Sequence, residues 1–207
     1  MKRTLAAEEL IIGVSSSHTE TSARSHDALP SVELPKADLP RLQGLAPVVG
    51  PGAKLLVLGS FPGVASLLAQ QYYAHPRNQF WPILSALWGL EVGEALNALP
   101  YSERLSVVKG RGLAIWDVYA GCVREGSLDS AIKASELNDL AGLIRQVPTL
   151  RAIAHNGGES ARHTRVTQAL GLPVFKLPST SPANASWSFE RKLAAWREAF
   201  AQAGLLD

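Results

Sequence analysis

The sequence predicts an α/β fold of three layers, in which helices cover both faces of a central, mostly parallel four-stranded sheet. Four short apolar runs of strand length alternate with segments whose apolar residues recur at helical spacing. A polar loop follows each run, which is typical of parallel strands whose ends gather at one edge of a sheet. A length of 207 residues with 46% hydrophobic residues suits one globular domain.

The strand candidates are Lys54–Leu58, Leu113–Val118, Arg151–Ala154 and Val174–Leu177. Short, mainly aliphatic runs without polar alternation indicate strands that are buried on both faces. The loops that follow them span Gly59–Gly63, Asp117–Gly121, His155–Gly158 and Pro178–Asn184. If the strands run the same way, all four loops meet at one rim, where ligands of such sheets bind.

Four helices are predicted from apolar residues that share one face. The clearest begins at Phe80, where apolar residues recur at i, i+3, i+4, i+7 and i+8 as far as Trp88. The other three are marked by Leu137, Leu140, Ile144 and Val147; by Val166, Ala169 and Leu170, ending at Gly171; and by Leu193, Trp196 and Phe200. Ser188 is a suitable N-cap for the last helix.

The N-terminal segment differs in composition from the rest. All 14 aromatic residues lie at or beyond Phe61, whereas the earlier part mixes charges and prolines with the run Ser15-Ser16-Ser17. Such a segment cannot bury enough apolar surface to offset its conformational entropy. We therefore expect residues 1–44 to be a disordered extension and residues 45–207 to form the domain.

Charge and cysteine content exclude several classes of protein. The net charge of +2 is far from that of a strongly basic binder, although it permits a nucleic-acid contact on one face. Cys122 is the only cysteine, which excludes an intramolecular disulfide and any four-cysteine metal site and fits a reducing compartment. Glu8 and Glu9 interrupt the apolar residues near the N-terminus, and no run reaches membrane-spanning length. We expect a cytoplasmic protein without membrane contact.

The most informative pattern joins two neighbouring segments. The first is Gly59-Ser60-Phe61-Pro62-Gly63, a turn in which the backbone can approach a ligand closely. The second is Tyr72-Tyr73-Ala74-His75-Pro76-Arg77-Asn78-Gln79-Phe80-Trp81. Polar and aromatic groups crowded around two prolines do not suit a core. They suit a pocket for a planar ligand that forms hydrogen bonds.

These two segments together resemble the first motif region of the uracil-DNA glycosylase superfamily, specifically its hypoxanthine-DNA glycosylase branch. The resemblance continues through Trp116-Asp117-Val118, His155-Asn156-Gly157-Gly158 and Ser179-Thr180-Ser181-Pro182-Ala183-Asn184-Ala185. It implies a fold like that of this superfamily and a monomeric enzyme that acts on DNA containing deaminated bases. It also implies hydrolysis of the N-glycosidic bond of a flipped base without a cofactor.

The resemblance assigns catalysis to Asn78. Superfamily members usually carry Asp or Asn two positions after the first-motif glycine, but Phe61 stands there and can neither orient nor activate water. In the branch that this chain resembles, the Asn of the His-Pro-x-Asn segment takes this role. An amide that positions water suffices once an oxocarbenium-like sugar has formed. Asn78 also suits capping of the Phe80 helix, and Phe61 suits either stacking on the flipped base or packing in the core.

Asp117 and Asn156 each end a strand and are candidates for base recognition. An ionised Asp117 can accept the N1–H of hypoxanthine or the N3–H of uracil, whereas it would reject the unprotonated N1 of adenine. The alternative is a buried carboxylate tied to backbone N–H groups. The Asn156 amide can both donate to and accept from a base edge, or it can simply serve a tight turn before two glycines. We also assign Ser60 to substrate binding. It is not expected to be a hydrolase nucleophile, because its sequence context lacks the Gly-x-Ser-x-Gly order.

The DNA backbone contacts are expected from the second-motif loop and from two residues of the first motif region. These residues are Ser179, Ser181, Pro182 and Asn184, together with His75 and Arg77. Hydroxyls and backbone N–H groups suit phosphates, and the proline stiffens the loop. Many superfamily members have a histidine in this motif, but none follows His163 here, which places uracil activity in more doubt than hypoxanthine activity.

We therefore predict a monofunctional glycosylase that removes a deaminated base, with hypoxanthine first among the candidates. No lysine stands in the matching motifs, which argues against a Schiff-base lyase step. No metal is expected, because no third ligand keeps a recognisable spacing with His75 and His155. The alternatives are a uracil-DNA glycosylase of the same superfamily and a non-catalytic module of this fold that binds nucleic acid or nucleotides.

Overall fold

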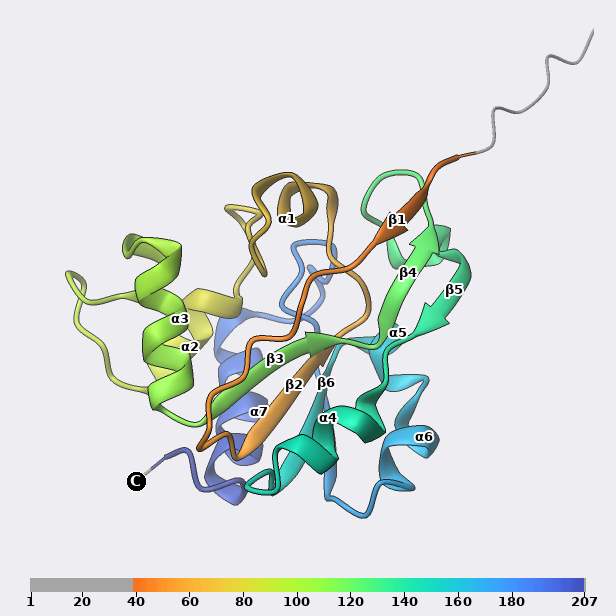
Figure 1. The fold of residues 1–207 in the computed structure, drawn as a ribbon. Coiled ribbons are helices and arrows are strands. Elements are labelled where there is room, and N and C mark those ends of the chain that lie inside the picture. The colour runs from red at the N-terminus through yellow and green to blue at the C-terminus, as the bar shows by residue number, and fades with distance from the viewer. Residues whose placement is uncertain (1–38, 207) are drawn as a thin grey trace, which may run out of the picture. The chain divides into compact units, whose positions relative to one another are not determined.

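A computed structural model describes residues 39–206. It contains a four-stranded sheet with the order β3-β2-β6-β7, in which every neighbouring pair is parallel (Figure 1). The strands span β2 Leu55–Gly59, β3 Leu113–Asp117, β6 Ala152–Asn156 and β7 Val174–Leu177. The predicted α/β fold is thereby confirmed, with each predicted strand present to within two residues at either end.

Successive residues of β2 enter two different cores, as expected for a strand covered on both faces. Leu55 and Val57 pack in one core, whereas Leu56 and Leu58 pack in the other. The first core contains helices α2 Phe80–Leu87, α3 Tyr101–Gly110 and α7 Phe189–Gln202. The second contains α4 Leu140–Gln146, and Figure 1 shows these helices on opposite sides of the sheet. The sheet is thus the middle of three layers.

Several helix ends differ from the predictions for local reasons. The predicted second helix began near Leu137, but Leu137 belongs to a strand and pairs with Tyr119. The Asp139 carboxylate accepts a hydrogen bond from the Gly142 N–H, and this cap fixes the start of α4 at Leu140. The third helix, α6 Thr164–Gln168, ends before Gly171, whose φ is +82°. Ser188 is confirmed as the N-cap of α7, since its side chain accepts from the Arg191 N–H.

A second sheet, which we did not predict, has the order β1-β4-β5 and is antiparallel. Its strands are β1 Arg41–Gln43, β4 Tyr119–Val123 and β5 Lys133–Leu137. Residues 41–43, which we assigned to the disordered extension, are therefore strand, and residues 1–38 of that predicted extension lie outside the described residues. This sheet carries the segment between β4 and β5, residues 124–132, called the β4–β5 segment below. That segment includes the 3₁₀ turn η2, Asp129–Ala131.

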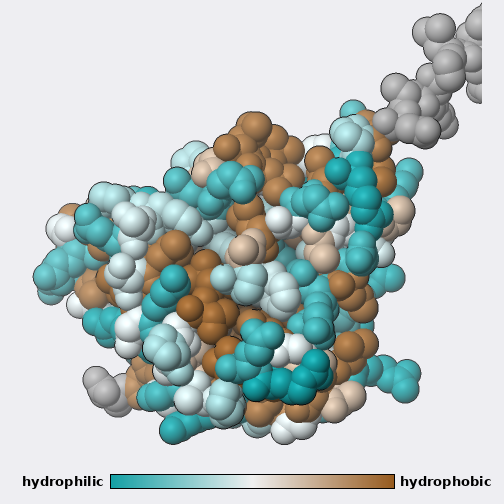
Figure 2. Space-filling model, in the orientation of Figure 1, coloured by the Kyte–Doolittle hydropathy of each residue, from teal (hydrophilic) through white to brown (hydrophobic). Residues whose placement is uncertain are grey.

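The remaining short elements are α1 Val64–Ala69, η1 Leu96–Ala98 and α5 Gly158–Ala161. Helix α1 follows β2 directly and presents apolar side chains at the surface, where Figure 2 shows hydrophobic residues gathered around it. Leu68 is its most exposed leucine. Among residues 39–206, no helix combines the length and the apolar character that crossing a membrane requires.

Candidate active site

The ends of β2, β3, β6 and β7 open into one cleft with a cavity volume of about 1170 Å³. All eleven residues that the sequence assigned to catalysis, substrate or DNA line it: Ser60, Phe61, His75, Arg77, Asn78, Asp117, Asn156, Ser179, Ser181, Pro182 and Asn184. They come from loops that are more than 100 residues apart at the extremes, and the parallel sheet brings them to one rim. The convergence is observed, while the role of each residue stays a prediction.

Asp117, the last residue of β3, is buried without a hydrogen-bonding partner for its Oδ2 atom among the described residues. Only 4% of the residue is exposed, and it lines the cleft. Burial and, to a smaller extent, the charge of Asp129 raise the pKa of the Asp117 carboxyl to about 7, against the opposing charge of Arg124. A buried carboxyl held by backbone N–H groups, the alternative considered above, is not what the structure contains. An unpartnered buried oxygen beside a cleft calls for an explanation, and a ligand contact for Asp117 stays a prediction.

The carboxyl lies against Gly59, and this contact explains the glycine. A Cβ atom on Gly59 would come within 2.3 Å of Asp117 Oδ1 and 3.6 Å of the Tyr73 hydroxyl. Any side chain here would therefore displace the carboxyl. The first loop of the cleft, residues 59–63, can begin only with glycine if Asp117 keeps this position.

Asn156, the last residue of β6, is held in the opposite way. Its Oδ1 accepts from the Thr180 N–H at 3.0 Å, and its Nδ2 donates to Thr180 Oγ1 at 2.9 Å and to the Tyr73 hydroxyl at 3.3 Å. Both amide hydrogens are thus engaged within the protein. The amide ties the end of β6 to the second loop, residues 178–188, so its first effect is to position that loop.

Tyr73 forms part of the wall between these two residues. Its backbone φ is +54°, a left-handed conformation that is uncommon for an aromatic residue, and its ring stacks on Phe80 with centroids 3.8 Å apart. Burial and the charge of Asp117 raise the pKa of the Tyr73 hydroxyl, which therefore stays protonated. The sequence placed Tyr73 in the first motif region but gave it no role. The strained backbone and the stack fix its hydroxyl beside Gly59.

Asn78 is engaged at the start of α2, while its catalytic role stays a prediction. Its Oδ1 accepts a hydrogen bond from the Phe80 N–H at 3.0 Å, so Asn78, one residue before the N-cap Gln79, satisfies the first free N–H of α2. Its Nδ2 makes no hydrogen bond to any described residue and lines the half-buried edge of the cleft. Asn78 therefore presents hydrogen-bond donors, rather than its carbonyl, to a ligand.

His75 and Arg77 lie at the rim beside Asn78. His75 Nδ1 accepts from the Arg77 N–H at 3.2 Å, and the His75 carbonyl accepts from the Asn78 N–H at 2.8 Å, which folds this turn back on itself. The Arg77 side chain is exposed and forms no ion pair with another described residue. It is available to a phosphate.

Phe61 is buried against the second core with 5% of its surface exposed, and it also lines the cleft. The buried guanidinium of Arg124 lies 5.0 Å above its ring, and Arg124 Nη2 donates to the Pro62 carbonyl. The core reading of Phe61 thus holds, with one edge left for a ligand. Arg124, which the sequence analysis missed, supports the first loop from below.

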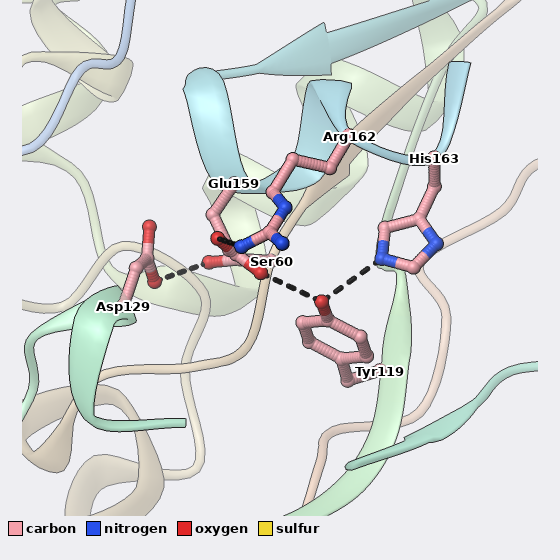
Figure 3. A network of polar contacts seen from close by, with 6 residues as sticks. All are labelled: Ser60, Tyr119, Asp129, Glu159, Arg162 and His163. Carbon is pink, nitrogen blue, oxygen red and sulfur yellow. Dashed lines mark hydrogen bonds and ion pairs between the residues drawn. The ribbon is translucent and has the colours of Figure 1, made fainter. Parts of the chain in front are cut away.

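Asp129 is a second carboxylate in the cleft, also missed from sequence. It lies on η2, is exposed, and accepts a 2.6 Å hydrogen bond from Ser60 Oγ through its Oδ1 (Figure 3). Desolvation and the charge of Glu159 raise the pKa of Asp129, whereas the Ser60 hydrogen bond lowers it. Only the antiparallel sheet brings Asp129 here, so no motif in the sequence pointed to it.

A polar network of residues that do not line the cleft lies near Asp129 and Ser60. The Tyr119 hydroxyl donates to Glu159 Oε1 at 2.7 Å and lies 2.9 Å from His163 Nε2, while Arg162 pairs with Glu159 (Figure 3). His155 is separate, fully buried between the hydroxyls of Ser160 and Thr167. Burial lowers its pKa to about 4, so it is neutral and structural. Within residues 39–206 no three acidic, His or Cys side chains gather as a metal site requires.

The second loop is braced by its own side chains. Ser179 Oγ accepts from the Ser181 N–H, Ser181 Oγ accepts from the Ala183 N–H, and Asn184 Nδ2 donates to the Ser179 carbonyl. Lys192 of α7 is 2% exposed and donates to the Asn184 carbonyl at 3.0 Å and to Gln79 Oε1 at 2.8 Å. One amine thereby joins the second loop to the first motif region.

Comparisons with known proteins agree with this architecture. A model of the uracil DNA glycosylase superfamily matches residues 46–201. Two curated proteins named hypoxanthine DNA glycosylase, from Methanosarcina barkeri and Methanosarcina acetivorans, are each 35% identical over 158 residues, which cover 76% of this chain and 97% of the relative. The solution NMR structure of a candidate uracil DNA glycosylase from Methanosarcina acetivorans superposes with a TM-score of 0.69 at 34% identity, covering 79% of this chain and 99% of that one.

Proposed function

We propose that this chain, which belongs to the uracil DNA glycosylase superfamily, is a DNA glycosylase that excises hypoxanthine from DNA and leaves an abasic site. Two relatives that it matches over almost their whole length are named hypoxanthine DNA glycosylases. The observation that carries the choice of base is the buried Asp117 carboxyl, which lines the cleft with its Oδ2 unpartnered.

The Asp117 carboxylate distinguishes hypoxanthine from adenine by hydrogen bonding. Hypoxanthine carries a hydrogen on N1, which the ionised carboxylate accepts, whereas adenine presents a bare N1 that this form repels, so the discrimination should be strongest above the Asp117 pKa of about 7. Because the carboxyl is buried, a wrong base would leave it desolvated and unpaired. Rejection of the unmodified base is what an enzyme that repairs deaminated DNA requires.

The cleft must receive a nucleotide that has left the base stack. Extrusion costs a few kcal/mol and less at a mispair, which favours lesions over paired bases. We assign stacking on the base to the exposed edge of Phe61, contact with the water to Asn78 Nδ2, and contact with phosphates to Arg77 and the second loop. The single, buried Cys122 is compatible with the cytoplasm.

The test is single-turnover cleavage of oligonucleotides that each hold one hypoxanthine, uracil or xanthine, with abasic sites then broken by alkali. We expect hypoxanthine to be released fastest, with turnover when substrate exceeds enzyme. Stoichiometric binding without abasic product would instead support the non-catalytic alternative. Fastest release of uracil would overturn the choice of base but not the reaction.

Asn78→Ala should lower the cleavage rate by about 10²-fold, because it removes the donor that holds water. The matched variant is Asn78→Asp, which keeps the Oδ1 acceptor for the Phe80 N–H but lacks the amide hydrogens. Asn78→Asp should therefore keep the thermal stability of the protein, which separates a loss of stability from a loss of the donor. If Asn78→Ala cleaves as fast as the unmodified protein, Asn78 does not hold the water.

A further inference from the structure

Asn78 can hold a water molecule but cannot take its proton. Its Oδ1 already accepts from Phe80, and an amide NH₂ group only donates. Hydrolysis of a glycosidic bond nevertheless removes a proton from water. This inference rests on the proposed glycosylase activity, and it concerns which side chain of the cleft receives that proton.

Among the described residues that line the cleft, the carboxylates are Asp117 and Asp129. They meet consecutive residues of the first loop, since Asp117 lies against Gly59 and Asp129 is hydrogen-bonded to Ser60. Consecutive Cα atoms are about 3.8 Å apart, so both carboxyls flank the same short piece of backbone. Their proximity agrees with the influence of the Asp129 charge on the Asp117 pKa.

The environments of the two carboxyls differ in a way that divides acid–base roles. Asp117 is buried with Oδ2 unpartnered, as suits a group that grips a base excluded from water. Asp129 is exposed to the cleft and receives the Ser60 hydroxyl on Oδ1, which favours the ionised form and leaves Oδ2 open. Paired carboxyls in unlike environments are a common arrangement for acid–base work on glycosidic bonds.

We propose that Asp129, oriented by Ser60, is a catalytic residue that accepts the proton of the attacking water. The C1′–N9 bond breaks with its electron pair passing to the purine, and the water oxygen bonds to C1′ of the resulting oxocarbenium ion. One water proton passes to Asp129 and the other remains on the new hydroxyl. The purine anion takes a proton from solvent, and Asp129 returns its proton to solvent. The negative charge of Asp129 also stabilises the sugar cation before water attacks.

The test compares Asp129→Asn with Glu159→Gln in single-turnover cleavage at about pH 8.5, well above the pKa of Asp117. Glu159 acts on Asp129 through its charge but does not line the cleft, so Glu159→Gln removes a nearby negative charge without removing the proposed acceptor. The groups that act on the pKa of Asp129 or share its side of the cleft are Arg124, Glu159, Ser60 and Asp117. We expect a loss of about 10²-fold for Asp129→Asn, and a rate within about threefold of the unmodified protein for Glu159→Gln. Equal rates for the two variants would overturn the proposal.

Two further measurements separate a proton acceptor from a structural support. Sodium formate should restore part of the rate of Asp129→Gly by supplying a carboxylate, and it should leave Asn78→Ala unchanged. Affinity for an abasic product should change little in Asp129→Asn. Absence of formate rescue together with weakened product binding would show that Asp129 only holds DNA. If the unmodified protein cleaves no lesion oligonucleotide, the proposed function fails, and the unmodified protein measured beside the variants shows this directly.

Discussion

Asp117 and Asn156 occupy equivalent places and are treated oppositely by the fold. Each ends a strand that flanks β2, and each carries a short polar side chain into the same cleft. The Asn156 amide donates both of its hydrogens, to Thr180 and Tyr73, whereas the Asp117 Oδ2 atom has no hydrogen-bonding partner in residues 39–206. The difference shows that the end of β6 is tied into the cleft wall, whereas the end of β3 holds an unpaired carboxyl oxygen, which we assign to the ligand.

The largest effect should come from the strand end that is kept free. Asp117→Ala should lower hypoxanthine excision by about 10²-fold, because a hydrogen bond to a charged group contributes roughly 1.5–3 kcal/mol. Affinity for an abasic product should change far less, since that product has no base. Single-turnover rates and product-binding isotherms measure the two. Equal losses in both would mean that Asp117 supports the cleft as Asn156 does.

The stability of an Asp117→Asn variant provides the control for this prediction. The folded pKa of Asp117 is about 7, far above the value of roughly 4 in an unfolded chain, so the folded state loses stability as pH rises from about 4 to about 7 and no further above that. An uncharged amide avoids that loss. The free energy of unfolding of Asp117→Asn should therefore exceed that of the unmodified protein by about 2–4 kcal/mol at about pH 8.5, and this difference should vanish near pH 4. Chemical denaturation at both values measures it, and a variant less stable at high pH would contradict the buried, unpaired state.

Asn156→Ala should show the converse, with stability falling first. The change leaves the Thr180 N–H without its acceptor in a buried place, which costs about 1–3 kcal/mol. Thr180→Val is the matched variant, because it removes the Oγ1 acceptor while keeping that N–H bond, and it should cost about 1 kcal/mol. Denaturation midpoints measure both. Unchanged stability with lost base selectivity would instead make Asn156 a reader of the base.

The polar ends of the strands could be predicted because parallel strands place their carboxyl ends together. Their opposite treatment could not, since Thr180 lies 24 residues from Asn156 and sequence does not pair them. Asp129 and Arg124 lie in the β4–β5 segment, and the antiparallel sheet that carries this segment could not be predicted. Strand β5 is exposed along its whole length and lacks the apolar alternation from which a strand is recognised. The run Gly126-Ser127-Leu128-Asp129 indicates a turn and nothing more.

The smallest effect concerns the rim, where neither strand end takes part. Arg77→Ala should weaken lesion and undamaged duplexes by similar factors and reduce the log–log salt slope of binding by about one. Arg145→Ala is the matched control, because Arg145 is exposed on α4 and does not line the cleft. Anisotropy titrations at several salt concentrations measure the slopes. A lost preference for the lesion with an unchanged slope would place Arg77 with Asp117 rather than at the phosphates.

The buried Lys192 amine bears on which partner, protein or DNA, deforms when the two bind. Its two acceptors belong to the second loop and to the first motif region, so separating these two segments would leave a buried ammonium without partners. Such a state costs several kcal/mol, which resists that separation. If the two segments stay joined when DNA binds, we expect the duplex to supply the bending and unstacking, so that sites which deform easily, such as mispairs, gain an advantage.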